Sequence, residues 1–153
     1  MNEDALNTVS FSLPGHLIRR MHQISTQVFA QNMRAAGLDL TPVQFAALDA
    51  LRHKPGIDQA GLAQAIDKDK ATIGAVVDRL EQKGLVTRTI NRRDKRARAV
   101  SLTAKGDKLL ITALPVVRRL QLDILPGLTT DEYRHFITLA TKVARAAGTT
   151  GPG

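Results

Sequence analysis

The densest group of charged side chains in this sequence lies between residues 88 and 98, where the net charge is +5 against +8 for the whole chain. Guanidinium and ammonium groups at this density bind phosphate oxygens, and Arg also enters the narrow minor groove of DNA. Asp94 lies two residues before Arg96, so its carboxylate can orient that guanidinium through a bidentate pair. This chemistry predicts contact with a nucleic-acid backbone. The charged residues of the segment are Arg88, Arg92, Arg93, Asp94, Lys95, Arg96 and Arg98.

The composition of the whole chain agrees with an anionic partner. Its 153 residues include 22 Lys and Arg against 14 Asp and Glu, which favours nucleic acid or an anionic membrane surface. We favour nucleic acid, because the basic segment lies in a predicted hairpin and not on the polar face of an amphipathic helix. Only 3% of the residues are aromatic, so the base-stacking platform of single-strand binding modules is missing. Double-stranded DNA is therefore the predicted partner.

The residues that enzymes and metal sites use are scattered or absent. The chain has no Cys, which excludes disulfides, thiolate zinc sites and iron–sulfur clusters. It has no H-E-x-x-H motif, no phosphate-binding P-loop and no G-x-G-x-x-G. We therefore predict no catalytic site, no bound metal and no cofactor. The four histidines are His16, His22, His53 and His135.

The elements around the basic segment follow from hydrophobic periodicity. Asp58 can cap a short helix, and a second helix runs from about Lys70 to Lys83, where Gly84 ends it. The alternation in residues 86–90 and 99–102 predicts two half-buried strands joined by a loop over 91–97. A short helix, a tight turn, a helix and a hairpin with a basic loop are typical of a winged helix-turn-helix. The predicted fold is mainly α with a small β-hairpin.

The helix over residues 70–83 has the features of a recognition helix. Ile73, Val77 and Leu80 form its apolar side, while its other side carries small residues that allow close approach to base edges. Two lysines stand at its entrance, and the Thr hydroxyl can bind a base or a phosphate. These entrance and outer residues are Lys68, Lys70, Ala71, Thr72, Gly74, Ala75 and Asp78.

Four further helices are predicted on either side of this unit. The first covers about residues 15–36, and the second begins with the capping box of Thr41 and Gln44 and ends at about residue 54. Thr103 caps a helix in which Pro115 predicts a kink. A second capping box, Thr129-x-x-Glu132, opens the last helix. Residues 1–12 and 148–153 are expected to be flexible tails.

Several stretches of the sequence resemble a known protein family. The run DKATIGAVVDRLEQKGLVTRTINRRDKRARAVSLTAKG resembles the recognition helix and wing of the MarR family of bacterial transcription regulators. It contains the D-x-R element of that family at Asp94-Lys95-Arg96, and the L-T-x-x-G element at Leu102, Thr103 and Gly106. The stretches GLDLTPVQFAALDAL and LTTDEYRHFITLATKVA, upstream and downstream of this run, match as well. The resemblance covers nearly the whole chain.

The resemblance implies a single MarR-like domain over residues 1–153, present as a homodimer. Residues 15–36 and 104–147 would form a helical dimerisation region, in agreement with apolar stripes too large for exposure on a small monomer. Residues 41–103 would form the winged helix-turn-helix, and two-fold symmetry predicts a pseudo-palindromic operator with half-sites about 10 bp apart. The DNA contacts are then predicted at Lys68, Lys70, Ala71, Thr72, Gly74, Ala75, Arg92, Arg93, Asp94 and Arg96.

The resemblance also implies a small-molecule effector, since members of the family commonly sense phenolic or aromatic carboxylate ligands between the dimer arm and the winged domain. His16 and Arg20 are four residues apart on the first helix and could bind a carboxylate, with His22 as a further candidate. Because the chain has no Cys, it cannot sense peroxide through thiol oxidation.

These observations predict a cytoplasmic, sequence-specific transcriptional repressor released from its operator by a small molecule. No apolar run approaches the ~18–20 residues of a membrane span, so a membrane partner is not expected. The alternative is a ligand-independent architectural DNA-binding protein. The two differ in competition experiments, because a regulator prefers its operator over random DNA by about 10³-fold or more.

Overall fold

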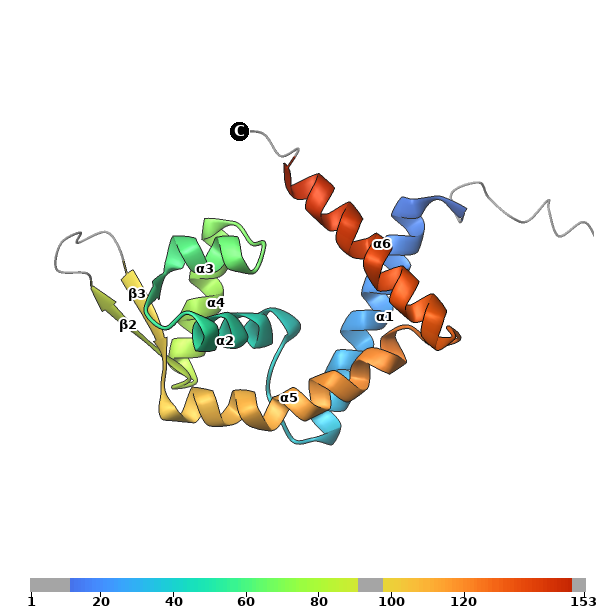
Figure 1. Cartoon of the computed structure of the whole chain (residues 1–153). Coiled ribbons are helices and arrows are strands. Elements are labelled where there is room, and N and C mark those ends of the chain that lie inside the picture. Colours follow the sequence, from blue (N-terminus) through green and yellow to red (C-terminus); the bar gives the residue numbers. More distant parts are fainter. Residues whose placement is uncertain (1–11, 91–97, 150–153) are drawn as a thin grey trace, which may run out of the picture.

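The computed structural model of the chain describes residues 12–90 and 98–149, and these form six helices and three strands (Figure 1). Helices α1, α5 and α6 form one part, which we call the arm. Helices α2, α3 and α4 and the strands form the other part, which we call the winged lobe. Helix α5 begins at the lobe and extends into the arm (Figure 1). The elements are α1 (Pro14–Ala35), α2 (Pro42–His53), β1 (Ile57–Asp58), α3 (Gln59–Ala65), α4 (Lys70–Gln82), β2 (Val86–Ile90), β3 (Arg98–Leu102), α5 (Ala104–Ile124) and α6 (Thr130–Thr149).

The predicted mainly helical fold with a small hairpin is confirmed, with one addition to the sheet. Strands β2 and β3 pair antiparallel from Val86 opposite Leu102 to Ile90 opposite Arg98. A third strand, β1, pairs antiparallel with β3 at Ile57 and Asp58, so the strand order is β1-β3-β2. Both predicted strands are present, and β1 was not predicted because a strand of two residues carries no periodic pattern.

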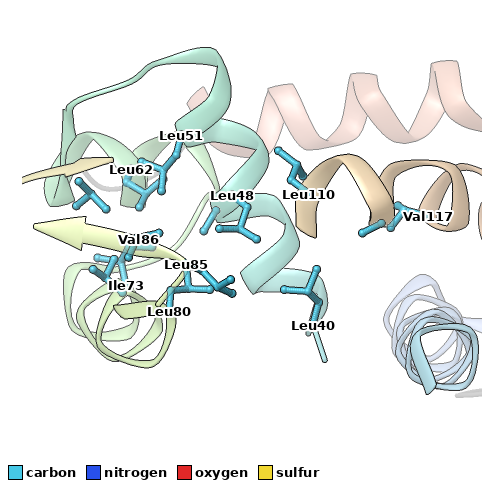
Figure 2. Packing of buried hydrophobic residues seen from close by; sticks show 14 of the residues in the cluster. Leu40, Leu48, Leu51, Leu62, Ile73, Leu80, Leu85, Val86, Leu110 and Val117 are labelled. Atoms are coloured by element: carbon cyan, nitrogen blue, oxygen red, sulfur yellow. The ribbon is translucent and has the colours of Figure 1, made fainter. Parts of the chain in front are cut away.

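The core of the winged lobe lies where the apolar faces of α2, α3 and α4 meet the sheet (Figure 2). The apolar positions predicted for α4 are buried completely, and each such side chain contributes about 1.5–3 kcal/mol when it is removed from water. Phe29 and Met33 of α1 are buried against the arm portion of the same cluster. The residues at the centre of the lobe are Leu48, Leu51, Leu62, Ile73, Val77, Leu80, Val86 and Val100.

Helix ends follow the capping signals of the sequence. The Thr41 hydroxyl accepts a hydrogen bond from the Gln44 N–H at 3.1 Å, and the Gln44 side chain accepts one from the Thr41 N–H at 3.2 Å. The corresponding pair of bonds joins Thr129 and Glu132 before α6. Helix α5 is continuous through Pro115, so the kink there stays a prediction.

Helix α6 ends later than the sequence suggested. It continues through Gly148 to Thr149, so the predicted tail was wrong for these two residues. Gly148 lies within α6, whereas Gly84 takes the left-handed conformation that commonly ends a helix, directly after α4. The remaining tail residues, 1–11 and 150–153, lie outside the described part of the chain.

Candidate nucleic-acid interface

A tight turn between α3 and α4 sets the position of the candidate recognition helix. Asp67 adopts the left-handed conformation with φ 56°, and the Lys68 N–H donates to the Ala63 carbonyl at 2.8 Å. Asp69 then caps α4, because its carboxylate accepts the Thr72 N–H at 2.6 Å. This hydrogen bond from the backbone of Thr72 lowers the pKa of Asp69 below its ordinary value, so the cap is negatively charged at neutral pH.

Helix α4 divides into a buried side and an exposed side, as a recognition helix requires. Ala71, Thr72 and Ala75 are exposed on the face opposite the core, and Lys68 is exposed just before the helix begins. Gly74 is half-buried, and a Cβ atom built there would lie 3.7 Å from the Gln59 amide nitrogen, an ordinary contact. Small side chains on this face leave the helix surface open to a major groove.

Several predicted contact residues lie beyond what the structure describes. Lys70 is the first residue of α4, but its side chain is outside the described part. The wing contacts predicted at Arg92, Arg93, Asp94 and Arg96 fall within residues 91–97, which are also outside it. The strands on either side of this segment are paired up to Ile90 and Arg98.

Arg88 does not have the role that the basic segment suggested. Its side chain on β2 is only 13% exposed, and its guanidinium binds the carboxylate of Asp78 on α4. Its Nε lies 3.6 Å from Glu81 Oε2, and its Nη1 donates to the Gln59 side chain of α3 at 3.3 Å. Two carboxylates therefore offset its charge, and Arg88 joins the wing strand to α4 instead of offering a free cation to phosphate.

The pattern of strand β2 contains a signal for this ion-pair cluster. Arg88 stands between Val86 and Ile90 on one side of the strand, and an Arg at such a position needs a buried or half-buried partner. Asp78, expected only as an outer-face residue of α4, supplies that partner. The free positive charge of the segment is correspondingly smaller than its composition indicates.

The candidate effector residues lie on α1. His16 is half-buried, and its Nδ1 accepts a hydrogen bond from Arg19 Nη2 at 3.1 Å. Arg20 and His22 are exposed on the same helix. Arg19, which donates this hydrogen bond, lies three residues after His16 and one residue before Arg20. The assignment of these residues to an effector stays a prediction.

Two further properties of the described residues bear on function. No group of three or more His, Asp or Glu side chains among them could hold a metal ion. None of their helices combines the length and the apolar character that crossing a membrane requires.

Comparison with known proteins finds transcriptional regulators. The sequence profile of the MarR family matches residues 38–97. The transcriptional regulator HosA of Escherichia coli O157:H7 is 35% identical over 128 residues, which cover 84% of this chain and 92% of HosA. The HTH-type transcriptional repressor NicR of Pseudomonas putida is 38% identical over 106 residues, which cover 69% of this chain and 66% of NicR.

Solved structures match over most of the chain. The structure of Bordetella bronchiseptica BpsR, which concerns the regulation of its DNA binding by 6-hydroxynicotinic acid, has a TM-score of 0.82 and 27% identity, covering 90% of this chain and 97% of BpsR. A mutant MarR from E. coli in complex with operator DNA has a TM-score of 0.79 and 27% identity, covering 90% of this chain and 99% of that protein.

Proposed function

The chain belongs to the MarR family of transcriptional regulators, and on this premise we propose that it is a homodimeric repressor that leaves its operator when a small aromatic carboxylate binds. The named relatives are regulators and not enzymes, in agreement with the absence of catalytic motifs from the sequence. The observation that carries the proposal is the exposed, small-residue face of α4, which lies beside a paired hairpin and begins at a charged cap.

Support for DNA contact comes from this face and from the relatives. Lys68, Thr72 and the small residues Ala71, Gly74 and Ala75 would meet a major groove, with Lys70 at the helix start. Arg92, Arg93, Asp94 and Arg96 would meet the adjacent backbone or minor groove. A solved relative, MarR, is in complex with operator DNA.

Support for a homodimer comes from apolar side chains that the single chain leaves exposed on the arm. Helix α6 contains no buried residue among those described, although apolar side chains follow one of its faces. A second copy of the arm would cover this surface and remove its contact with water. The exposed apolar residues of the arm include Leu17, Ile18, Leu122, Ile137, Leu139 and Val143.

Support for an aromatic carboxylate effector comes from the relatives and from α1. BpsR is regulated by 6-hydroxynicotinic acid, which is an aromatic carboxylate, and NicR is named a repressor. His16, Arg20 and His22 are cationic or protonatable groups near one end of the arm, and such groups bind carboxylates.

The first test is selection of an operator from random duplexes, followed by competition with excess random DNA. We expect the protein to prefer the selected operator by about 10³-fold or more at fixed salt concentration. Arg96→Ala should reduce operator affinity and leave the oligomeric state unchanged, whereas Arg119→Ala, on an exposed part of α5, removes the same charge and should have little effect. Equal affinity for operator and random DNA would instead support the architectural alternative.

The second test addresses the effector. Addition of 6-hydroxynicotinic acid or of hydroxybenzoates to the operator complex should release the DNA in a fluorescence anisotropy titration. Arg20→Ala should raise the ligand concentration needed for release. Operator binding that none of these compounds changes would contradict the aromatic carboxylate part of the proposal and leave the DNA-binding part in place.

A further inference from the structure

The chain crosses between the arm and the winged lobe at two places. The first crossing is the connection of residues 36–41 between α1 and α2, and the second is at Thr103, between β3 and α5. Both crossings contact the same short segment, residues 83–85, directly after the candidate recognition helix α4. The contacts of this segment with the two crossings, together with the apolar core that α5 shares with the lobe, therefore set the position of α4 relative to the arm.

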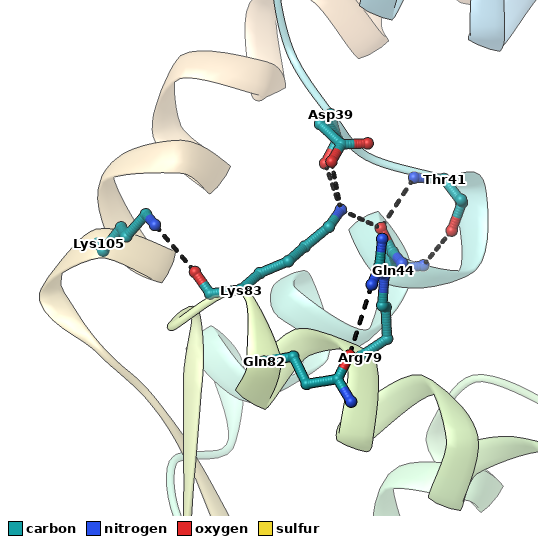
Figure 3. A network of polar contacts seen from close by, with 7 residues as sticks. All are labelled: Asp39, Thr41, Gln44, Arg79, Gln82, Lys83 and Lys105. Carbon is teal, nitrogen blue, oxygen red and sulfur yellow. Dashed lines mark hydrogen bonds and ion pairs between the residues drawn. The ribbon is translucent and has the colours of Figure 1, made fainter.

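The Lys83 side chain makes the contacts with the first crossing (Figure 3). Its Nζ donates to the Asp39 carbonyl at 2.7 Å and to Gln44 Oε1 at 3.1 Å, and it lies 3.2 Å from the Asp39 carboxylate. The side chain is only 15% exposed. Gln44 is buried, and the same Oε1 accepts the Thr41 N–H, so the ammonium binds a group that is already held in place.

The backbone of the same segment makes the contacts with the second crossing. Lys105 Nζ donates to the Lys83 carbonyl at 2.9 Å (Figure 3). The Thr103 hydroxyl donates to the Gly84 carbonyl at 2.7 Å, and the Thr103 N–H donates to the Leu85 carbonyl at 3.0 Å. The carbonyls at the end of a helix lack partners within it and carry partial negative charge, so an ammonium group there is favourable.

We propose that Lys83 is a positioning residue that holds the recognition helix at a defined angle to the arm, and that it thereby sets the spacing of the two DNA half-sites. The ammonium is the group that links the end of α4 to the connection from α1. Without it, the apolar core, which continues from the lobe into α1 and α5 and of which Lys83 is not a member, stays in place, but the end of α4 loses its contact with the connection from α1 and its angle to the arm varies more. The spacing part of this inference rests on the proposed homodimer and its palindromic operator.

The functional test compares operators of different half-site spacing. Wild-type protein should prefer the selected operator over versions with one base pair inserted or removed at its centre by about tenfold or more. Lys83→Met should lose most of this preference. Lys108→Met, at an exposed position of α5, is the matched control because it removes the same charge, and it should keep the preference. Retained spacing preference in folded Lys83→Met protein would overturn the inference.

A structural test works whether or not the protein is a dimer. The chain has no natural Cys, so spin labels can be placed on Gln27→Cys in the arm and Gln64→Cys in the winged lobe, both exposed positions. An excess of unlabelled protein removes distances between chains. The distance distribution should be narrow in the wild type and in Lys108→Met and clearly broader in Lys83→Met; an unchanged narrow distribution in Lys83→Met overturns the inference.

Two safeguards separate the possible failures. If no operator can be selected with the wild type, the proposed function fails, and the spin-label distances alone decide the role of Lys83. If Lys83→Met does not fold, Asp39→Asn replaces it, because Asp39 is exposed and its substitution removes the carboxylate that lies 3.2 Å from the Lys83 ammonium. That variant should also broaden the distribution, and an unchanged width would contradict the inference.

Discussion

Single residues in this protein carry constraints that a helix or strand assignment does not reveal. The sequence pattern places Arg88 on a strand, but its guanidinium is paired with two carboxylates of α4, which the pattern does not show. Gly106 belongs to a helix, yet its lack of a side chain is what lets α5 approach the segment after α4. Asp67 lies in the turn after α3, where its N–H donates to the Gln64 carbonyl at 3.3 Å and its backbone takes a positive φ. The constraints on Gly106 and Asp67 predict how substitutions there change the free energy of unfolding.

Gly106→Ala should destabilise the protein strongly. A Cβ atom at this position would lie 2.1 Å from the Leu85 carbonyl oxygen, which is backbone and cannot move without shifting the end of α4. We expect a loss of about 3 kcal/mol in the free energy of unfolding, measured by urea denaturation. Gly15→Ala is the control, since nothing lies within 4 Å of its Cβ, and it should change stability by less than about 1 kcal/mol. Equal effects of the two substitutions would contradict this explanation.

Asp67→Val should destabilise the turn between α3 and α4. The left-handed conformation, with φ 56°, is costly for β-branched side chains and well tolerated by Asp and Asn. We expect Asp67→Val to lower the free energy of unfolding by about 1–2 kcal/mol, and Asp67→Asn, which removes the same charge, to stay within about 0.5 kcal/mol of wild type. Thermal and chemical denaturation check both values, and a Val variant as stable as the Asn variant would exclude backbone strain.

At the scale of elements, helix α4 depends on an ionised cap. The Thr72 N–H lowers the folded-state pKa of Asp69 below its unfolded-state value. The unfolded state therefore binds the proton first as the pH falls, so the stabilisation is complete above the unfolded-state pKa and is lost as the pH passes down through the folded-state pKa. Glu132 shows the same direction for its pKa at the start of α6, because the Thr129 N–H donates to it.

A pH series of unfolding measurements tests this cap. Asp69→Asn keeps a capping oxygen but does not ionise, so its stability relative to wild type should improve as the pH falls from about 5 to below 4. The comparison is made between variants because other carboxylates also titrate in this range. A stability difference that stays constant over the whole range would show that Asp69 titrates alike in both states.

At the scale of the whole molecule, the arm exposes an apolar surface that the winged lobe does not cover. Val143 of α6 is 65% exposed and contributes little to the fold of a single chain. In the proposed homodimer it would be buried, at about 1.5–3 kcal/mol per side chain. Measuring the oligomeric state of the protein is therefore the most direct test of whether this apolar surface forms the dimer interface.

Val143→Asp should weaken the dimer without unfolding the chain. We expect the dissociation constant to rise by about tenfold or more, as measured by sedimentation velocity over a concentration series. Thr138→Asp introduces the same charge at an exposed position that is not three or four residues from any apolar residue of α6, and it should leave the dimer intact. Deleting the residues after Gly127 removes α6 entirely and should also produce monomers; a dimer that survives the deletion would rule out α6 as the interface.

Local signals in the sequence determined much of this protein. The capping boxes at Thr41 and Thr129 and the apolar side of α4 appear where they were predicted. Such features involve residues three or four positions apart, so helix geometry alone relates sequence to structure. The exposure of Lys68, Ala71, Thr72 and Ala75 follows from the same geometry, whereas the contacts assigned to the wing and to the effector stay predictions.

Tertiary structure alone decided the contacts between distant residues. Asp78 and Arg88 are 10 positions apart and lie on different elements, and Asp39 and Lys83 are 44 positions apart. Strand β1 likewise exists only because β3 offers it hydrogen bonds. Periodicity places a side chain on one face of its own element but does not say which face of another element it will meet. That choice depends on the packing of the whole chain. Here the packing places Arg88, a member of the basic segment, against two carboxylates of α4.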